Sequence, residues 1–186
     1  TTGTITLGAN VNTTGAQNYV GPVSFNSDIA LNVTGGTDAD DVVFGSTVTA
    51  TTDSLDINVA ASGDVTFGDG SGTDTVAGIN ALTVDGNAIT VNTPVSATSV
   101  VLQGANTTGD QLILASGGSV SATGLVTIGA ANDTTEIETI SLSANISSDS
   151  DSSGNENLSI LSNSAGGAVA TFATSGVILN AGTGAI

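Results

Sequence analysis

Short apolar runs, separated by polar and glycine-rich segments, recur from one end of the chain to the other. Within each run, apolar and polar positions alternate with a period of two, as in residues 29–33. No segment shows the i, i+3, i+4, i+7 apolar spacing of an amphipathic helix. Because β-branched residues dominate the runs, the pattern predicts an all-β protein. The predicted strands are 4–7, 23–25, 29–33, 41–44, 55–59, 64–67, 82–84, 88–91, 112–114, 125–128, 137–142, 158–161 and 177–179.

Several predicted strands repeat at a nearly constant interval. The strand openings at Val42, Val65, Ile89 and Leu112 are almost evenly spaced along the chain. The segment Asp41-Val-Val-Phe-Gly also recurs as Asp64-Val-Thr-Phe-Gly. A repeat of about 20–25 residues is typical of a β-solenoid, in which each repeat forms one coil and stacks on the next. We therefore predict a single parallel β-helix domain over residues 1–186.

The residue types suit a narrow coil of this kind. Val, Ile, Leu and Ala would fill inward positions and Thr, Ser and Asn outward ones, while Gly and Asn would supply left-handed or tight-turn conformations at the corners. Phe44 and Phe67 fall on equivalent repeat positions, so we expect their rings to stack. The alternative is a β-sandwich or jelly roll of pilin type, which also has frequent, regularly spaced turn signals.

Composition narrows the possible functions. The chain has no Lys, Arg, His or Cys and a formal net charge of −17. Nucleic acid is excluded as a partner because nothing can neutralise phosphates, and zinc sites and His-based triads cannot be built. No apolar run approaches the ~18–20 residues of a spanning helix, so membrane insertion is not expected. Only carboxylates remain for acid–base chemistry, and the pairs Asp40–Asp41 and Glu136–Glu138 are poorly arranged for it. We predict no enzyme activity.

Three acidic segments are candidate calcium sites. Residues 149–156 follow the first half of an EF-hand loop, with oxygen ligands at positions 1, 3 and 5 and Gly at position 6. Position 12 is Ile160 where a bidentate Glu is required. Calcium suits a chain that offers only hard oxygen ligands, and the alternative is that these side chains serve turns and solubility. The candidate ligands are Asp149, Asp151, Ser153 and Glu156, with Asp38 and Asp40, and Asp69 and Asp74, in the shorter segments.

Some segments also resemble a known family. Thr13-Thr-Gly-Ala-Gln-Asn-Tyr-Val-Gly-Pro-Val-Ser-Phe, Leu82-Thr-Val and Val177-Ile-Leu-Asn-Ala-Gly-Thr-Gly are similar to phrases of filamentous-haemagglutinin-like and autotransporter-type bacterial surface adhesins. The similarity is best over residues 1–90 and 177–186. The resemblance implies a secreted, right-handed parallel β-helix displayed as a stalk or fibre. The family motif carries no catalytic residues.

We therefore expect an extracellular or cell-surface structural protein, a mature chain from which any signal peptide has been removed. It would be a fibre or adhesin-stalk unit and one period of a longer array, because neither end of the sequence resembles a cap and uncapped coils stack head to tail. Its expected partners are copies of itself and a host or matrix glycan or protein. One alternative is a pilin-like β-sandwich that donates the strand 1–11 to a neighbour. The other is a calcium-binding surface adhesin domain.

Overall fold

The protein is built from parallel β-strands. The computed structural model describes residues 3–105, 109–129, 137–153, 156–161, 171–174, 176–182 and 184–186. Every strand pair in these ranges is parallel, and they contain no helix. Consequently, this part of the chain holds no helix that is long and apolar enough to cross a membrane. The all-β prediction is confirmed.

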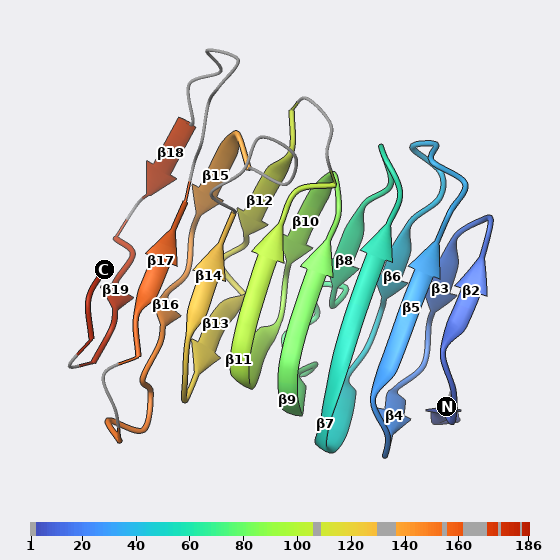
Figure 1. The fold of residues 1–186 in the computed structure, drawn as a ribbon, viewed down its shortest axis with the longest axis horizontal. Helices are drawn as coiled ribbons and strands as arrows, with labels where there is room; N and C mark the ends of the chain where they lie inside the picture. Colours follow the sequence, from blue (N-terminus) through green and yellow to red (C-terminus); the bar gives the residue numbers. More distant parts are fainter. Residues whose placement is uncertain are drawn as a thin grey trace.

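The strands form three ladders that run the length of the molecule (Figure 1). The first ladder contains β1 (Ile5–Leu7), β4 (Val23–Phe25), β7 (Val48–Val59), β9 (Val76–Asp85), β11 (Pro94–Gln103), β13 (Ser119–Ala122), β16 (Ile146–Ser147) and β19 (Leu179–Asn180). The second contains β2 (Val11–Thr13), β5 (Ile29–Val33), the later parts of β7, β9 and β11, β14 (Val126–Ile128) and β17 (Leu158–Ile160). The third contains β3 (Gln17–Tyr19), β6 (Val42–Phe44), β8 (Val65–Phe67), β10 (Ala88–Val91), β12 (Gln111–Leu114), β15 (Thr139–Leu142) and β18 (Thr171–Thr174).

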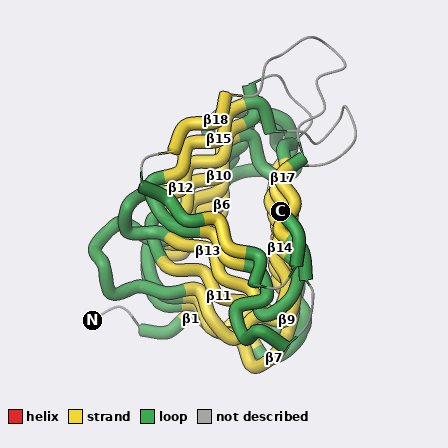
Figure 2. The backbone as a smooth tube through the Cα atoms, turned by 90° about the vertical axis from the view of Figure 1, so that its left-hand side faces the viewer, coloured by secondary structure: helices red, strands yellow, loops and turns green. Residues whose placement is uncertain are grey.

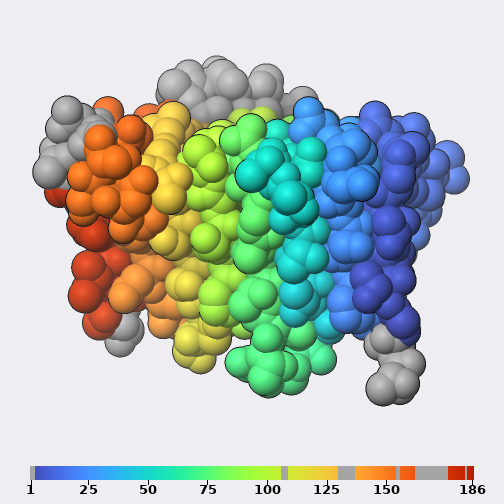
Figure 3. Space-filling model, turned by 90° about the horizontal axis from the view of Figure 1, so that it is seen from below, coloured from blue at the N-terminus to red at the C-terminus, as the bar shows by residue number. Residues whose placement is uncertain are grey.

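These ladders make up two sheets. The first and second ladders belong to one sheet of 12 strands, because β7, β9 and β11 are long enough to contribute to both. The third ladder is a separate sheet of 7 strands. Viewed along the stack, the ladders occupy three sides of the molecule (Figure 2). Successive stretches of sequence therefore lie as bands from one end of the molecule to the other (Figure 3).

The register of the third ladder confirms the repeat inferred from sequence. Val42 pairs with Val65, Val65 with Ile89, and Ile89 with Leu112. All four side chains are completely buried, so they form one continuous row in the core. The predicted interval holds less well elsewhere in the described ladders. Ile5 pairs with Val23, which is a shorter interval, and Ile146 pairs with Leu179, which is a longer one.

The predicted aromatic stack is present at one end of the third ladder. The rings of Phe44 and Phe67 lie 5.4 Å apart between centroids and are nearly parallel, at 3°. Tyr19 extends the stack, with its ring 5.1 Å from that of Phe44. The buried Tyr19 hydroxyl donates a hydrogen bond to Gln17 Oε1 at 2.8 Å, so a polar pair closes this apolar stack.

Asp and Asn side chains at several corners join one layer of strands to the next. Asp41 Oδ1 accepts a hydrogen bond from Asp64 N at 3.0 Å, and Asp64 Oδ1 accepts one from Ala88 N at 2.9 Å. The same contact joins Asn10 to Ala30, Asp28 to Ser54, Asn145 to Ile178 and Asn157 to Ala185. The expectation that Asn supplies left-handed corners is wrong for the described residues. There, the residues other than Gly with positive φ are Thr52, Ala61, Asp149 and Ser152.

Candidate functional site

The predicted calcium loop at 149–156 follows β16. Asp149 is buried, and its carbonyl accepts a hydrogen bond from Ser152 N at 3.0 Å. Asp151 is exposed, and its Oδ1 accepts a bond from Ser153 N at 3.1 Å, which closes a local turn. Glu156 Oε2 is shielded from solvent and accepts no hydrogen bond from any described residue. Gly154, the sixth position of the predicted loop, lies outside the described residues.

The shorter acidic segments also serve their own turns. Asp40 Oδ2 accepts hydrogen bonds from Thr37 N at 2.9 Å and Thr37 Oγ1 at 2.7 Å, whereas Asp38 is exposed in the same turn. Such bonds are the usual way in which an Asp side chain stabilises a turn. This geometry supports the structural alternative for the 37–40 turn.

Asp69 and Asp74 occupy the loop between β8 and β9. Asp69 Oδ1 accepts a bond from Ser71 N at 2.8 Å. Bonds from Ser71, with a smaller contribution from the Asp74 side chain, lower the pKa of Asp69 below its ordinary value. Asp74 Oδ1 accepts a bond from Ser46 Oγ at 3.2 Å, which ties this loop to the preceding layer. In the described ranges no three His, Cys, Asp or Glu side chains gather as a metal-binding group. The calcium sites therefore stay predictions.

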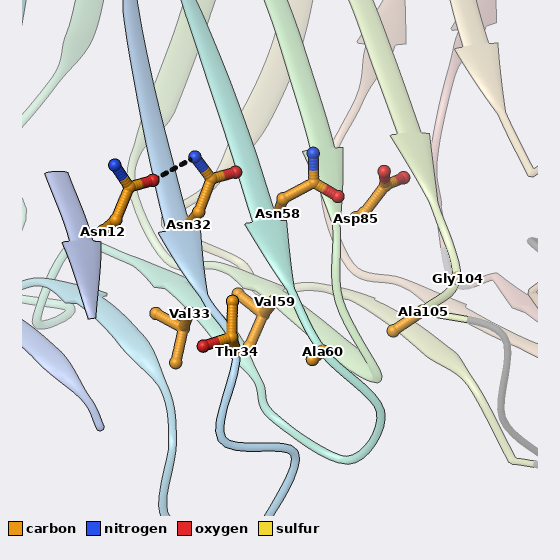
Figure 4. A pocket seen from close by; sticks show the side chains of 10 residues that line it. All are labelled: Asn12, Asn32, Val33, Thr34, Asn58, Val59, Ala60, Asp85, Gly104 and Ala105. Atoms are coloured by element: carbon orange, nitrogen blue, oxygen red, sulfur yellow. Dashed lines mark hydrogen bonds between the residues drawn. The ribbon is translucent and has the colours of Figure 1, made fainter. Parts of the chain in front are cut away.

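A groove that the sequence did not predict lies where the second ladder ends. Its volume is about 540 Å³, and polar side chains line one side of it (Figure 4). The floor is apolar and comes from residues at or just after strand ends. The floor includes Val33, Val59, Ala60 and Ala105. The volume is within the range of about 300–1,000 Å³ that is common for ligand pockets.

The polar side of the groove is one row of the second ladder. Asn12 pairs with Asn32, Asn32 with Asn58, and Asn58 with Asp85. The register places these side chains one per strand, about 4.8 Å apart. Gln103 pairs with Asp85 and is the next residue of the same row. We call Asn12, Asn32, Asn58, Asp85 and Gln103 the polar row.

Hydrogen bonding along the polar row is incomplete. Asn32 Nδ2 donates to Asn12 Oδ1 at 2.7 Å, which satisfies one pair of amides. Asn58 is exposed and makes no side-chain hydrogen bond to the described residues. Asp85 Oδ1 is shielded from solvent and accepts no hydrogen bond from the part of the chain that the structure describes. Asn58, the middle member of the row, therefore retains bonding capacity toward solvent, whereas Asp85 Oδ1 is closed off from it.

Asp85 is the only charged member of the polar row. Partial burial raises its pKa above the ordinary value, a hydrogen bond with Gln103 lowers it, and the Asp56 charge raises it slightly. The sequence carried a partial signal for this row, because Asn32 and Asn58 each stand between the last two apolar residues of a predicted strand.

Known proteins add no constraint to this site. Comparison of the chain with protein-family models, curated proteins and solved structures gave no match. The resemblance to bacterial surface adhesins therefore stays a prediction from the quoted segments.

Proposed function

We propose that the protein is a right-handed parallel β-helix that serves as a structural unit of an extracellular fibre or adhesin stalk. The observation that carries the proposal is the in-register parallel pairing along all three ladders. Each strand pairs with the strand of the same ladder one circuit earlier, as expected when the chain winds around an axis. The β-sandwich alternative calls for antiparallel sheets, for which the described pairs give no support.

The path of the chain supports a right-handed coil. In Figure 2 the C-terminal side of the molecule faces the viewer, and β13, β14 and β15 follow one another anticlockwise. A chain that turns anticlockwise while it advances toward the viewer describes a right-handed helix. Parallel crossover connections in proteins have this hand in nearly all cases.

A structural role suits the chemistry of the chain. A stack of parallel strands satisfies its interior backbone groups along the axis, and the corner Asp and Asn side chains add bonds in the same direction. The chain also lacks Cys, Met, Lys and Arg, so it offers no thiol or thioether to oxidants and no cleavage site to trypsin-like proteases. Both properties favour a protein that persists outside the cell.

The absence of cysteine permits a direct test of the coil. Thr66 on β8 and Thr90 on β10 are register partners with outward side chains, as are Ser96 on β11 and Ser121 on β13. Replacing either pair with cysteine places two thiols one strand apart, about 4.8 Å, which is within the ~4.4–6.8 Å that a disulfide requires between Cα atoms. Mild oxidation of T66C/T90C and S96C/S121C should produce disulfide-bonded monomers.

The control for this test keeps one cysteine and moves the other. In T66C/I113C the two positions lie two strands apart, about 9.6 Å, which is beyond the reach of a disulfide. This control should stay reduced under the same conditions. The coil is rejected if neither in-register pair oxidises, or if the control oxidises equally well.

Self-association is the second part of the proposal. The outermost strands of a parallel stack expose backbone groups that a further copy can pair with, and such contacts produce filaments when they do not close. Electron microscopy of the purified chain at rising concentration should reveal particles joined end to end. Single particles at every concentration would reject stacking of free chains.

The other two functions differ from this one in measurable ways. In a donor-strand pilin, residues 1–11 would extend into a neighbouring molecule, whereas β1 pairs with β4 of its own chain. Thr1 and Thr2 lie outside the described residues. A calcium-binding adhesin domain would depend on Asp149, Asp151, Ser153 and Glu156, and its stability would respond to calcium and chelator.

A further inference from the structure

We propose that Asp69-Gly70, in the exposed loop between β8 and β9, is a site of spontaneous isoaspartate formation, and that the stack protects the same dipeptide at Asp85-Gly86. The inference goes beyond a structural role, because it assigns a covalent modification to one peptide bond. The sequence holds two Asp-Gly dipeptides and no Asn-Gly. Since the two dipeptides are chemically identical, only their surroundings can make them react differently.

The reaction needs nothing but the chain and water. The backbone nitrogen of the glycine attacks Cγ of the preceding aspartic acid, so an N–Cγ bond forms and a Cγ–O bond breaks. The amide proton and the carboxyl hydroxyl leave together as water, and a five-membered succinimide remains. A second water then opens the ring. When it breaks the bond between the ring nitrogen and the original backbone carbonyl carbon, the main chain continues through Cβ and Cγ as isoaspartate. Glycine favours ring closure because it has no Cβ to obstruct it.

The surroundings of Asp69-Gly70 permit this ring closure. Every residue from 69 to 73 is exposed. Asp69 Oδ1 accepts a hydrogen bond from Ser71 N at 2.8 Å, so the carboxyl group lies against the backbone of the next two residues. Gly70 N donates no hydrogen bond to a described residue, and a Cβ added at Gly70 would meet nothing within 4 Å. The succinimide can therefore form here without displacing a neighbouring layer.

The surroundings of Asp85-Gly86 oppose it. Asp85 ends β9 and is paired with Asn58 on one side and with Gln103 on the other. Gly86 N donates a hydrogen bond to Gln103 O at 3.3 Å. A Cβ added at Gly86 would lie 3.0 Å from Val65 Cγ2, so the backbone is closely packed at this point. Ring closure has to turn the peptide group out of this packing, and the reaction therefore waits for a local opening of the stack.

The sharpest test is the matched pair Asp69→Asn and Asp85→Asn. Asparagine forms the same succinimide with loss of ammonia, and the later addition of water leaves a measurable gain in mass. An amide does not titrate in this range, so the different pKa values of the two native carboxyls do not affect the comparison. At neutral pH the intact Asp69→Asn chain should lose ammonia at least about tenfold faster than Asp85→Asn, which corresponds to an opening free energy of about 1.4 kcal/mol or more.

The control is the same pair unfolded in urea, where the two variants should lose ammonia at similar rates. The native chain is tested by incubation for several weeks below its melting transition. Chymotrypsin separates the two sites, because Phe67 and Leu82 flank the first of them, and electron-transfer fragmentation then locates isoaspartate. We expect it at Asp69 and not at Asp85. The proposal is overturned if folded Asp85→Asn reacts as fast as folded Asp69→Asn. It is also overturned if Asp69→Asn keeps its amide when folded and loses it in urea, or if isoaspartate forms equally at both sites of the folded native chain.

Discussion

The single carboxylate of the polar row gives the sharpest stability prediction. Asp85→Asn should stabilise the protein at neutral pH, because it removes the charge of a carboxylate whose Oδ1 is shielded and has no donor among the described residues. It would also extend the amide row toward Gln103, the register partner of Asp85. The nearby Asp56 charge opposes ionisation of Asp85, and the other neighbours in the row, Asn58 and Gln103, are neutral.

The magnitude follows from hydrogen-bond energetics. A buried polar group without its hydrogen bond costs about 1–3 kcal/mol and more when it is charged, so a neutral amide reduces this cost. The partial exposure of Asp85 keeps the gain at the low end of the range. We therefore expect Asp85→Asn to increase the free energy of unfolding by about 1 kcal/mol at pH 7. For a chain of this length this corresponds to a rise in Tm of about 2–4 °C.

The effect should depend on pH with a definite sign. Since folding raises the pKa of Asp85, the folded state favours its protonated form. That contribution is present below the unfolded value of about 3.9 and is lost as pH rises through the folded pKa. The difference between variant and wild type should therefore be largest at neutral pH and should shrink near pH 3–4.

Urea unfolding followed by far-UV circular dichroism measures this difference. Asp38→Asn is the matched control, since it removes the same unit charge from an exposed turn and should change stability by less than about 0.5 kcal/mol. The reasoning is refuted if Asp85→Asn is no more stable than the wild type at pH 7, or if its advantage is the same at every pH.

Four further predictions concern packing, backbone conformation and calcium. Gly78→Ala should destabilise by about 1–3 kcal/mol or more in urea unfolding, because Gly78 has a φ of 75° and an added Cβ would overlap the Ala50 carbonyl oxygen. Thr52→Gly should instead stabilise by about 0.5–1 kcal/mol in the same assay, since this β-branched residue has a φ of 72°. Phe44→Ala should cost about 3–5 kcal/mol in chemical unfolding, because it opens a cavity in the ring stack. If the Asp149 loop binds calcium, saturating calcium should raise Tm by about 5 °C or more and chelator should reverse the rise, whereas an unchanged midpoint rules out a structural ion.

The strands that sequence reasoning found are those with large inward side chains. Residues 29–33 and 88–91 were predicted with the bounds that β5 and β10 have, because Ile, Leu and Val alternate with smaller residues in them. Their partners one repeat away were recognisable for the same reason. A stack of identical layers repeats the same inward positions, so the pattern predicts both the strand and its register.

Several of the strands that were missed carry small or polar side chains at inward positions. β13 (Ser119–Ala122) places Ala122 in the core, and the first half of β11 places Ala97 there. β3 places Gln17 inward, where its Nε2 donates to the carbonyl oxygens of Val11 and Asn32 at 3.2 and 3.1 Å. Ala and Gln give little hydrophobic alternation, so tertiary stacking determines these strands more than local pattern does.

The corner chemistry was visible in the sequence and was misinterpreted. Asp41, Asp64, Asn87 and Asp110 recur at equal intervals and precede four successive strands of the third ladder. Their spacing predicts equivalent positions, which is what the register gives. Sequence patterns cannot distinguish a left-handed corner residue from a side chain that accepts a bond from the next layer. Backbone geometry was needed to decide between these roles. In the same way, the position of the polar row beside a groove could be recognised only from the structure.

The groove lies at the ends of strands, where packing constrains the sequence less than it does inside the stack. Inward strand positions are constrained by the layers above and below them, so they have little freedom to encode a binding function. Loops between ladders are less constrained, because doubling a loop costs only about 0.6 kcal/mol in closure entropy. The length of the chain per coil does vary. Far fewer residues separate Ile5 from its register partner Val23 than separate Ile146 from Leu179. The floor residues Val33, Val59 and Ala105 all lie at or just beyond the ends of second-ladder strands, where the chain departs toward the third ladder. A rigid stack with variable corners can therefore acquire a ligand site without disturbing the pairing that stabilises it.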